Sequence, residues 1–361
     1  MAGRRQEDQR RQTRTSGEGT QAHTALPIVS PERILQTDGS MGAARVLAVG
    51  VQLGIFTHIA AGQTAVAEIA RSAQASERGI RMLLNALVSL QFLTKAQDTY
   101  ALTPVAAEFL VRGRPFYLGQ IMEGDWMWES WGHLADAVRT GQSFRHVDST
   151  PAAAEPFFRA YIPMLYVINL PGARRAAQVL VGHGVPADGL RVLEIGCGSA
   201  VWSIAIAEAA GPTTRVTAQD FPGVLELTRD YVRRHGVEPQ YDFLPGDQRQ
   251  VPLGTDQFDL AILARYVHEL AAPAACDLFR RVFVALKRGG RIAVADLMPN
   301  NERTAPPGPL LFALRMLLHT AEGDAYTPAE YTRWLESVGF TDITITPDMG
   351  TDVPLIVGVK P

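Results

Sequence analysis

Two glycines and a carboxylate stand at the ends of two expected strands, in an order typical of adenosine-binding α/β proteins. Gly196 and Gly198 come directly after the apolar strand expected at residues 191–195, and a helix is expected from Val201. Glycine lets a backbone approach a ligand closely and take conformations barred to other residues. Asp220 ends the next expected strand, where a carboxylate can bind both ribose hydroxyls. The pattern predicts a site for an adenosine-containing cofactor.

A third strand end adds polar groups to this predicted site. Gly246, Asp247 and Gln248 follow the strand expected at residues 241–244, where a carboxylate or an amide can meet an adenine amino group. Glu194, inside the first strand, also belongs to the candidate cofactor-binding residues. Dinucleotide enzymes carry a third glycine in the first turn, but here the turn continues with Ala200, which argues against a dehydrogenase.

The elements that position these residues alternate between strands and helices from residue 189 onward. Seven strands are expected, at residues 191–195, 215–219, 241–244, 258–263, 291–296, 341–346 and 354–359. The clearest helices between the first five lie at residues 201–210, 223–235 and 274–286, as in a parallel sheet with helical crossovers. The last two strands, around the turn at Asp348–Gly350, are expected to form an antiparallel pair.

The region before this sheet predicts a second, helical domain. Residues 34–110 have helical patterns, and the apolar stretch at residues 41–56 predicts a helix buried on nearly all sides. Helical patterns at residues 66–70 and 80–90, followed by a short hairpin at 92–103, resemble a winged helix. Its second helix has only two basic residues, Arg78 and Arg81, which favours a structural or dimerising role over DNA binding.

Aromatic and methionine side chains concentrate at residues 115–175. They fit either a helical core or the wall of a pocket for a flat, partly apolar ligand. The candidates for acceptor-binding residues in this stretch are Trp126, Trp128, Trp131, Phe157, Tyr161 and Met164.

Composition places limits on the class of protein. The 361 residues carry a net charge of −3, and a pI near 6.3 gives no global basic field for nucleic acid. Cys197 and Cys276 have neither disulfide nor metal-ligand spacing, and no segment has the length of a membrane span, so we expect a cytoplasmic protein. Four regions are expected: a disordered polar tail at 1–28, the winged helix at 29–115, a helical linker contributing to the acceptor pocket at 116–185, and the cofactor-binding domain at 186–361.

Beyond the tail the chain resembles the small-molecule O-methyltransferases of bacterial secondary metabolism and plant phenylpropanoid metabolism. The resemblance rests on residues 192–198, 219–222, 246–247, 263–270, 286–296, 326–334 and 339–340. It implies a class I, Rossmann-like, seven-stranded methyltransferase domain that binds S-adenosylmethionine (SAM). It also implies that the winged-helix domain forms a homodimer.

The resemblance also implies catalytic roles. His268 lies just after the fourth strand, where a family histidine takes the proton from the acceptor hydroxyl, and a neutral imidazole suits this task near neutral pH. Asp296 matches a carboxylate that orients this histidine in plant members. The family usually continues the histidine with Asp-Trp, whereas this chain has Glu269 and Leu270. Arg265 lies in the cofactor-facing run, where the family often has a basic residue.

Two further positions differ from the family pattern or add to it. A second family carboxylate falls near Ala325, which cannot replace it, although Glu322 and Asp324 are close in sequence. His319 falls where some members have a histidine in the acceptor pocket. With His268 it could form half of a metal site, but two histidines without a carboxylate partner do not indicate a metal.

The expected activity is methyl transfer from SAM to a hydroxyl of an aromatic or polyketide-like small molecule, with His268 as general base. One alternative is methylation of carbon or nitrogen, in which His268 only orients the acceptor. Another is a SAM-binding winged-helix regulator without catalysis, against which the acidic pI argues. A third is a relative that decarboxylates or hydroxylates its substrate.

Overall fold

The computed structural model describes residues 29–147, 151–182, 188–347, 349 and 353–361. The expected tail at 1–28 and most of the expected turn at 348–350 therefore lie outside the described residues. The N-terminal elements are α1 (Glu32–Gln52), α2 (Ile55–Ala60), α3 (Val66–Ser72), α4 (Glu77–Ser89), β1 (Leu93–Ala96), β2 (Thr99–Leu102) and α5 (Pro104–Phe109).

This order of helices followed by an antiparallel hairpin confirms the winged-helix prediction. The Ser76 side chain accepts a hydrogen bond from Gly79 N and so begins α4, whose apolar face packs on α2, α3 and the hairpin. The largest fully buried side chains here include Phe56, Leu84 and Tyr100. Burial of one face per element forms the core of this region.

The prediction that the first apolar helix is buried on nearly all sides is wrong for the single chain. In the first half of α1, Ile34 is 72% exposed, Leu35 64% and Met41 60%. Burial is complete only near its end, at Gly50 and Val51, where the helix reaches the winged-helix core. Gly54, in the left-handed region at φ 66°, then separates α1 from α2.

The aromatic-rich region is mostly helical. Its elements are η1 (Gly119–Met122), α6 (Trp126–Gly132), α7 (Leu134–Thr140) and the long α8 (Pro151–Gly182). Alanines and glycine on α8, among them Ala173 and Ala177, let it pack closely on α9. None of the described helices is long and apolar enough to cross a membrane.

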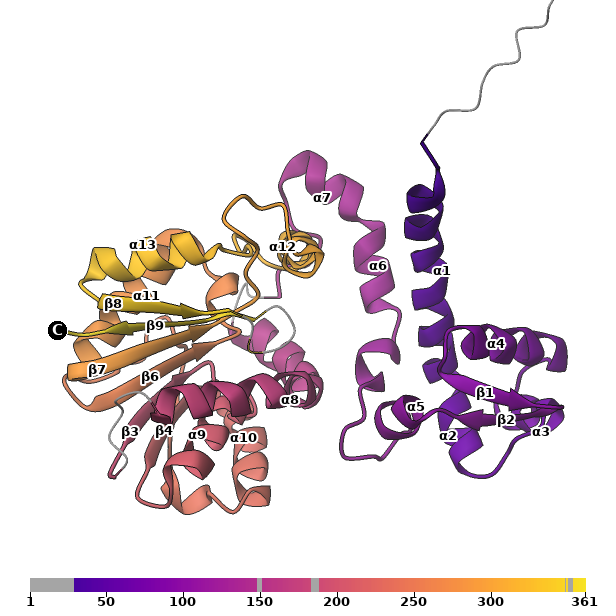
Figure 1. Cartoon of the computed structure of the whole chain (residues 1–361), viewed down its shortest axis with the longest axis horizontal. Helices are drawn as coiled ribbons and strands as arrows, with labels where there is room; N and C mark the ends of the chain where they lie inside the picture. Colours follow the sequence, from indigo (N-terminus) through magenta and orange to yellow (C-terminus); the bar gives the residue numbers. More distant parts are fainter. Residues whose placement is uncertain (1–28, 148–150, 183–187, 348, 350–352) are drawn as a thin grey trace, which may run out of the picture. The chain divides into compact units, whose positions relative to one another are not determined.

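The seven predicted strands form one sheet (Figure 1). They are β3 (Arg191–Ile195), β4 (Arg215–Asp220), β5 (Tyr241–Pro245), β6 (Phe258–Ala264), β7 (Leu286–Ala295), β8 (Thr341–Thr346) and β9 (Leu355–Val359). The order is β5-β4-β3-β6-β7-β9-β8, with β3 to β7 parallel and β9 antiparallel to both of its neighbours. This is the class I SAM methyltransferase fold, with a doubly wound sheet.

The helices that cover the sheet include α9 (Val201–Ala210), α10 (Pro222–Arg234), α11 (Ala272–Ala285) and α13 (Pro328–Val338). The chain also forms α12 (Pro307–His319) and the short turns η2 (Glu238–Gln240) and η3 (Val267–Glu269). Successive strand residues point to opposite faces: Val192 packs with α8, α9 and α10, whereas Leu193 packs with α11 and α13. The inner parallel strands β3, β4, β6 and β7 are largely buried on both faces, whereas the edge strand β5 is partly exposed, and the carboxyl ends of the parallel strands meet the loops that carry the polar residues.

Candidate active site

The carboxyl ends of β3, β4 and β6 open onto two adjoining cavities. The first, of about 210 Å³, is lined by Gly196, Gly198, Asp220 and Arg265 from these strand ends and by side chains of α8 and α12. The second, of about 290 Å³, extends along the loop after β6. Both are lined by Phe158, Phe221, Gln248, Tyr266 and Glu269. The parallel sheet therefore places the cavities where α/β folds bind ligands.

The turn after β3 brings backbone atoms to the cavity wall. Gly196 and Gly198 have φ angles of 63° and 53°, and Ala200, at 55°, is the N-cap of α9. A Cβ atom at Gly196 would lie 3.1 Å from the Tyr266 ring. The close approach of this ring and the left-handed conformation both require glycine at 196, and both Gly196 and Gly198 line the cavity.

Asp220 is fixed beside this turn. Its Oδ2 accepts a hydrogen bond from Gly198 N at 2.8 Å and its Oδ1 one from Phe221 N at 2.7 Å. Burial raises the pKa of Asp220 to about 6, while these two N–H donors oppose the shift. The carboxylate lines the cavity in a single orientation, as binding of a ribose diol requires.

Gln248 is the residue of the third strand end that reaches the cavity. Its side chain is buried, and its Oε1 has no hydrogen-bond partner among the described residues. Asp247 is instead held by Arg249, with Oδ2 and Nη2 2.7 Å apart, and Gly246 is fixed by a hydrogen bond from Gln219 Nε2 to its carbonyl oxygen at 2.7 Å. Neither Gly246 nor Asp247 is among the residues that line the cavity.

Glu194 also lies apart from the cavity. It is 1% exposed, and its Oε2 accepts a hydrogen bond from Ser203 N, in the first turn of α9, at 3.2 Å. Burial raises its pKa to about 8. The carboxyl therefore satisfies the beginning of a helix, where four N–H groups lack partners within the helix.

An adenosine-containing cofactor fits these residues. The unpaired amide oxygen of Gln248 offers an acceptor for an amino group, Asp220 offers acceptors for hydroxyls, and the glycine turn at Gly196 admits a ligand close to the backbone. The three groups belong to the three adjacent strands β5, β4 and β3.

His268, on η3, and Asp296, directly after β7, form a buried pair. His268 Nδ1 lies 2.6 Å from Asp296 Oδ1, and the His268 backbone N donates to Oδ2 at 3.2 Å. Burial alone would raise the pKa of Asp296, but the charge and hydrogen bonds of His268 hold it below its ordinary value. Because the carboxylate accepts a hydrogen at Nδ1, Nε2 carries the lone pair. His268 lines the cavity, so this pair can remove a proton from a molecule there.

Four donors surround the Asp296 carboxylate. Besides the two from His268, Leu297 N donates to Oδ1 at 2.9 Å, and the Tyr331 hydroxyl, from α13, donates to Oδ2 at 2.9 Å. Tyr331 is fully buried. The carboxylate is thus held in one orientation by groups from three segments, which in turn fixes the imidazole.

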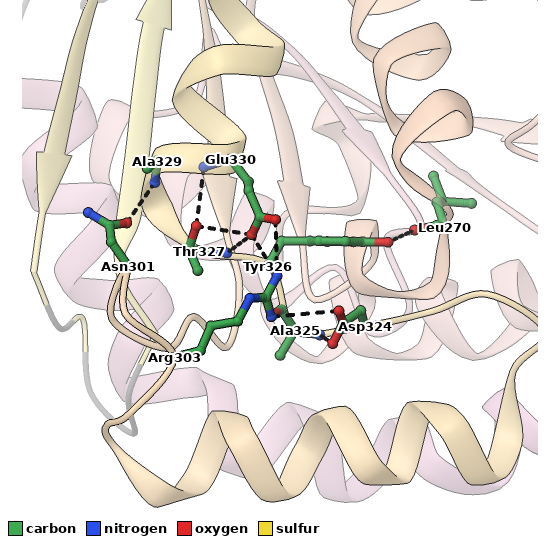
Figure 2. A network of polar contacts seen from close by, with 9 residues as sticks. All are labelled: Leu270, Asn301, Arg303, Asp324, Ala325, Tyr326, Thr327, Ala329 and Glu330. Carbon is green, nitrogen blue, oxygen red and sulfur yellow. Dashed lines mark hydrogen bonds and ion pairs between the residues drawn. The ribbon is translucent and has the colours of Figure 1, made fainter. Parts of the chain in front are cut away.

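A polar network holds the segment after α12 against the loop that carries His268 (Figure 2). Arg303 donates to the Ala325 carbonyl at 2.7 Å and pairs with Glu330, and the Tyr326 hydroxyl donates to the Leu270 carbonyl at 2.5 Å. Asp324 N donates to the His268 carbonyl at 2.9 Å. These bonds hold the carbonyl groups of His268, within η3, and of Leu270, directly after it, and so limit movement of His268.

The second family carboxylate has no replacement near Ala325. Ala325 is fully buried against Phe312 and Met316 of α12, and the Asp324 carboxylate lies 3.6 Å from Arg303. Glu322 is exposed and lines the second cavity.

The remaining wall of the first cavity comes from α8 and α12. Among the residues predicted for the acceptor, Phe157, Tyr161, Met164 and His319 line it. Trp126 contacts three of these rings from behind, with centroid distances of 5.9 Å to Phe157, 5.3 Å to Tyr161 and 5.6 Å to His319. The predicted pocket wall therefore comes from α8, with Trp126 of α6 supporting it.

Trp128 and Trp131 are not among the residues that line either cavity. Trp128 is 44% exposed. Residues 126, 128 and 131 cannot all share one helical face, because each helical residue turns the side chain by about 100°. Only Trp126 lies on the face of α6 that contacts the cavity wall.

Three residues of the site were not predicted. Tyr266, which lines the cavity, and Tyr331, which reaches Asp296 from α13, lie inside the runs 263–270 and 326–334 of the resemblance, but no role was assigned to them. Arg315 also lines the cavity and lies outside every such run. Arg265, which the sequence did indicate, has a φ of 58°, the left-handed region, and its Nε and Nη1 are buried without partners in the described part of the chain. Such a backbone in a bulky residue often marks a functional site.

The seven-stranded fold, the glycine turn beside Asp220 and the facing His268–Asp296 pair together define a SAM-dependent methyltransferase. Comparisons with known proteins agree. Residues 38–112 match an O-methyltransferase dimerisation domain, and residues 185–341 match an O-methyltransferase domain.

Similar proteins cover nearly the whole chain. The tetracenomycin polyketide synthesis 8-O-methyl transferase of Streptomyces glaucescens is 32% identical over 92% of this chain and 98% of its own. Mouse acetylserotonin O-methyltransferase is 31% identical over 84% of this chain and 82% of its own length. The crystal structure of human N-acetylserotonin methyltransferase in complex with SAM superposes with a TM-score of 0.78, at 26% identity, over 92% of this chain and 99% of that one. The chain belongs to the O-methyltransferase family.

Proposed function

We propose that this enzyme transfers the methyl group of SAM to a hydroxyl of an aromatic or polyketide-like small molecule. The observation that carries the proposal is the His268–Asp296 pair facing a cavity that also contains the glycine turn and Asp220. The relative from Streptomyces glaucescens, whose name gives a polyketide pathway and an O-methyl transfer, supports this acceptor class.

The cofactor side of the cavity is assigned to residues of the strand ends. Gly196 and Gly198 admit the cofactor to the backbone, Asp220 accepts its ribose hydroxyls and Gln248 its adenine amino group. Arg265 has buried, unpaired N–H groups that suit a carboxylate. When bound, SAM supplies a methyl group on a sulfonium, which is an electrophile. Three of the residues predicted to bind the cofactor act indirectly. Glu194 holds the beginning of α9, and Gly246 and Asp247 hold the loop after β5.

His268 is proposed as the general base. Its Nε2 takes the hydroxyl proton of the acceptor as the oxygen is methylated, and Asp296 stabilises the imidazolium that forms. Phe312 packs edge-on against the His268 ring, with centroids 4.7 Å apart, and keeps water from one side of it. The flat apolar rings of Phe157 and Tyr161 offer stacking surfaces for an aromatic acceptor.

The test combines cofactor binding with turnover. Calorimetric titration with SAM is expected to show binding that is lost in Asp220→Ala, and a panel of hydroxylated naphthalenes is expected to yield products heavier by one methylene. His268→Ala should abolish the product and keep cofactor binding. Turnover that survives His268→Ala would favour methylation of carbon or nitrogen, and absence of SAM binding would refute the proposal.

The enzyme is also proposed to form a homodimer through its N-terminal domain. We place the boundary between this domain and the helical linker near residue 115, and the boundary between the linker and the catalytic domain near residue 185. The apolar residues Ile34, Leu35 and Met41 on α1 are exposed in the single chain, and an apolar surface of this kind favours a partner. Light scattering on the full chain should give twice the monomer mass, and replacing Ile34 and Met41 by Lys should give monomers. A monomeric wild type would contradict the proposal.

A further inference from the structure

The end of the first cavity formed by α8 and α12 contains buried polar groups that the proposed chemistry does not use. Arg315 and His319 lie one turn apart on α12, and Tyr161 faces them from α8; all three line the cavity. Arg315 Nε, both ring nitrogens of His319 and the Tyr161 hydroxyl are buried without hydrogen-bond partners among the described residues. Buried polar groups are nearly always paired, so this cluster indicates a polar ligand group.

The charge of this cluster is positive, and no ion pair among the described residues compensates it. No carboxylate of the described chain forms an ion pair with Arg315, whereas the neighbouring Arg145 is paired with Glu129 at 2.5 Å. Burial and the charges of Arg315 and Arg145 lower the pKa of His319 to about 4, so its ring stays neutral. Burial raises the pKa of Tyr161 to about 12, so its hydroxyl stays protonated and can donate.

The two cavity arginines differ in their surroundings. Arg265 and Arg315 both lie near the Phe312 ring, with Cζ 5.2 Å and 5.8 Å from its centroid. Burial lowers the pKa of Arg265; the negative charge of Asp296 opposes this shift, and the positive charge of Arg315 adds to it. Because two cations repel each other in a partly dry site, an anion beside Arg315 lowers the energy of both.

We propose that the acceptor carries an anionic oxygen group, a carboxylate in the simplest case, which binds Arg315 with hydrogen bonds from Tyr161 and His319. This inference rests on the proposed function and narrows its substrate class to acidic hydroxyaromatic compounds. Phe312 contacts both His268 and Arg315, so the group that is anchored and the hydroxyl that is methylated both lie next to this ring. A guanidinium suits the role because it binds a carboxylate through two parallel hydrogen bonds.

The test uses positional isomers of hydroxynaphthoate, each paired with its uncharged carboxamide. Both members of each pair are titrated into enzyme saturated with S-adenosylhomocysteine, and kcat/KM is measured with SAM. At least one carboxylate is expected to bind about tenfold more tightly than its carboxamide, as one charge-assisted pair permits. In Arg315→Met this preference should fall to within about threefold, and Arg315→Lys should retain part of it.

Two controls separate the possible outcomes. Arg280→Met removes a positive charge from the exposed surface of α11 and should leave the preference unchanged. Arg315→Met should keep the wild-type melting temperature, because Arg315 is only partly buried and forms no ion pair among the described residues that the substitution would break. A matching melting temperature excludes misfolding as the cause of the lost preference.

Three results would overturn the inference. They are the absence of a carboxylate preference in every pair, an equal loss for both members in Arg315→Met, and weaker S-adenosylhomocysteine binding in that variant, which would assign Arg315 to the cofactor. Failure of the proposed function would give a different result. S-adenosylhomocysteine would not bind, or no compound would be methylated, and the preference for hydroxynaphthoate over its carboxamide would still test the role of Arg315.

Discussion

Replacing Asp296 by Asn tests the proposed base most sharply. Four donors converge on the Asp296 carboxylate: His268 Nδ1 and Leu297 N at Oδ1, and His268 N and the Tyr331 hydroxyl at Oδ2. An asparagine amide accepts at one oxygen only, so its NH2 group must face one of these pairs. If the NH2 group faces the donors at the Oδ1 position, the imidazole changes tautomer and Leu297 N loses its hydrogen-bond partner. If the NH2 group takes the Oδ2 position, the His268 backbone N–H loses its hydrogen-bond partner.

Either orientation leaves one buried N–H unpaired, so we expect the free energy of unfolding to fall by about 1–3 kcal/mol. A neutral amide also cannot stabilise the imidazolium, so kcat/KM should fall by about 10²–10⁴-fold, the usual contribution of a general base. The assay is turnover of a hydroxynaphthalene acceptor with SAM, beside urea unfolding and calorimetric titration with S-adenosylhomocysteine. Binding of this product should stay within about threefold of wild type, because Asp296 does not line the cavity.

Asp277→Asn makes the same chemical change on the exposed surface of α11, where Asp277 pairs with Arg280, and it serves as the matched control. It should leave turnover unchanged. Turnover in Asp296→Asn within about threefold of Asp277→Asn would refute the assignment of His268 as a base that depends on its carboxylate.

Three further predictions follow from the site. Tyr331→Phe removes one donor from Asp296, so the carboxylate that orients His268 is held less firmly and kcat should fall several-fold; an unchanged kcat would assign Tyr331 a packing role only. The pKa of Asp220 is raised to about 6, and hydroxyl donors favour its ionised form, so S-adenosylhomocysteine binding should weaken as pH falls through 6. Asp220→Asn should bind this product weakly at every pH. A calorimetric pH series on both proteins checks these two expectations. Gly196→Ala places a methyl group 3.1 Å from the Tyr266 ring in a left-handed conformation, so cofactor affinity should fall about tenfold or more; a normal Kd would show that the cofactor does not use this turn.

The raised pKa of Asp220 also has a consequence for stability. Its folded-state value lies above its ordinary value, so the native state binds the proton more tightly than the unfolded chain does. The ligand-free enzyme therefore loses stability from this group as pH rises from about 4 to 6. Asp220→Asn should remove that slope in a series of urea unfolding curves, and persistence of the slope would assign it to other groups.

Much of the fold could be predicted because its signals are local. The strands at residues 191–195 and 258–263 are short apolar runs, and β3 and β6 have nearly these bounds. The expected helix at residues 201–210 coincides with α9. β7 begins at Leu286, earlier than expected, because Leu286 already pairs with Phe258 of β6; the register then shifts, and pairing resumes at Arg291, after the glycines at 289–290 where the sequence indicates a turn.

The sequence predicted correctly those residues of the site that lie at the ends of strands, and it was less reliable for side chains on loops. Gly196, Gly198 and Asp220 line the cavity because the carboxyl ends of parallel strands must share one edge. Asp247 was placed with them by position alone, and its ion pair with Arg249 holds it elsewhere. Spacing along the chain does not determine the orientation of a side chain in a loop.

The amino-acid sequence by itself determined the order of elements, the glycine turn, the Asp220 carboxylate and the spacing of His268 and Asp296. These depend on periodicity and on glycine, which act over a few residues. Only the tertiary structure decided that Tyr331 donates to Asp296, that Arg315 faces the cavity unpaired and that Trp128 is exposed. These contacts join helices far apart in the chain, and the packing of those helices on the sheet determines which of their faces is buried.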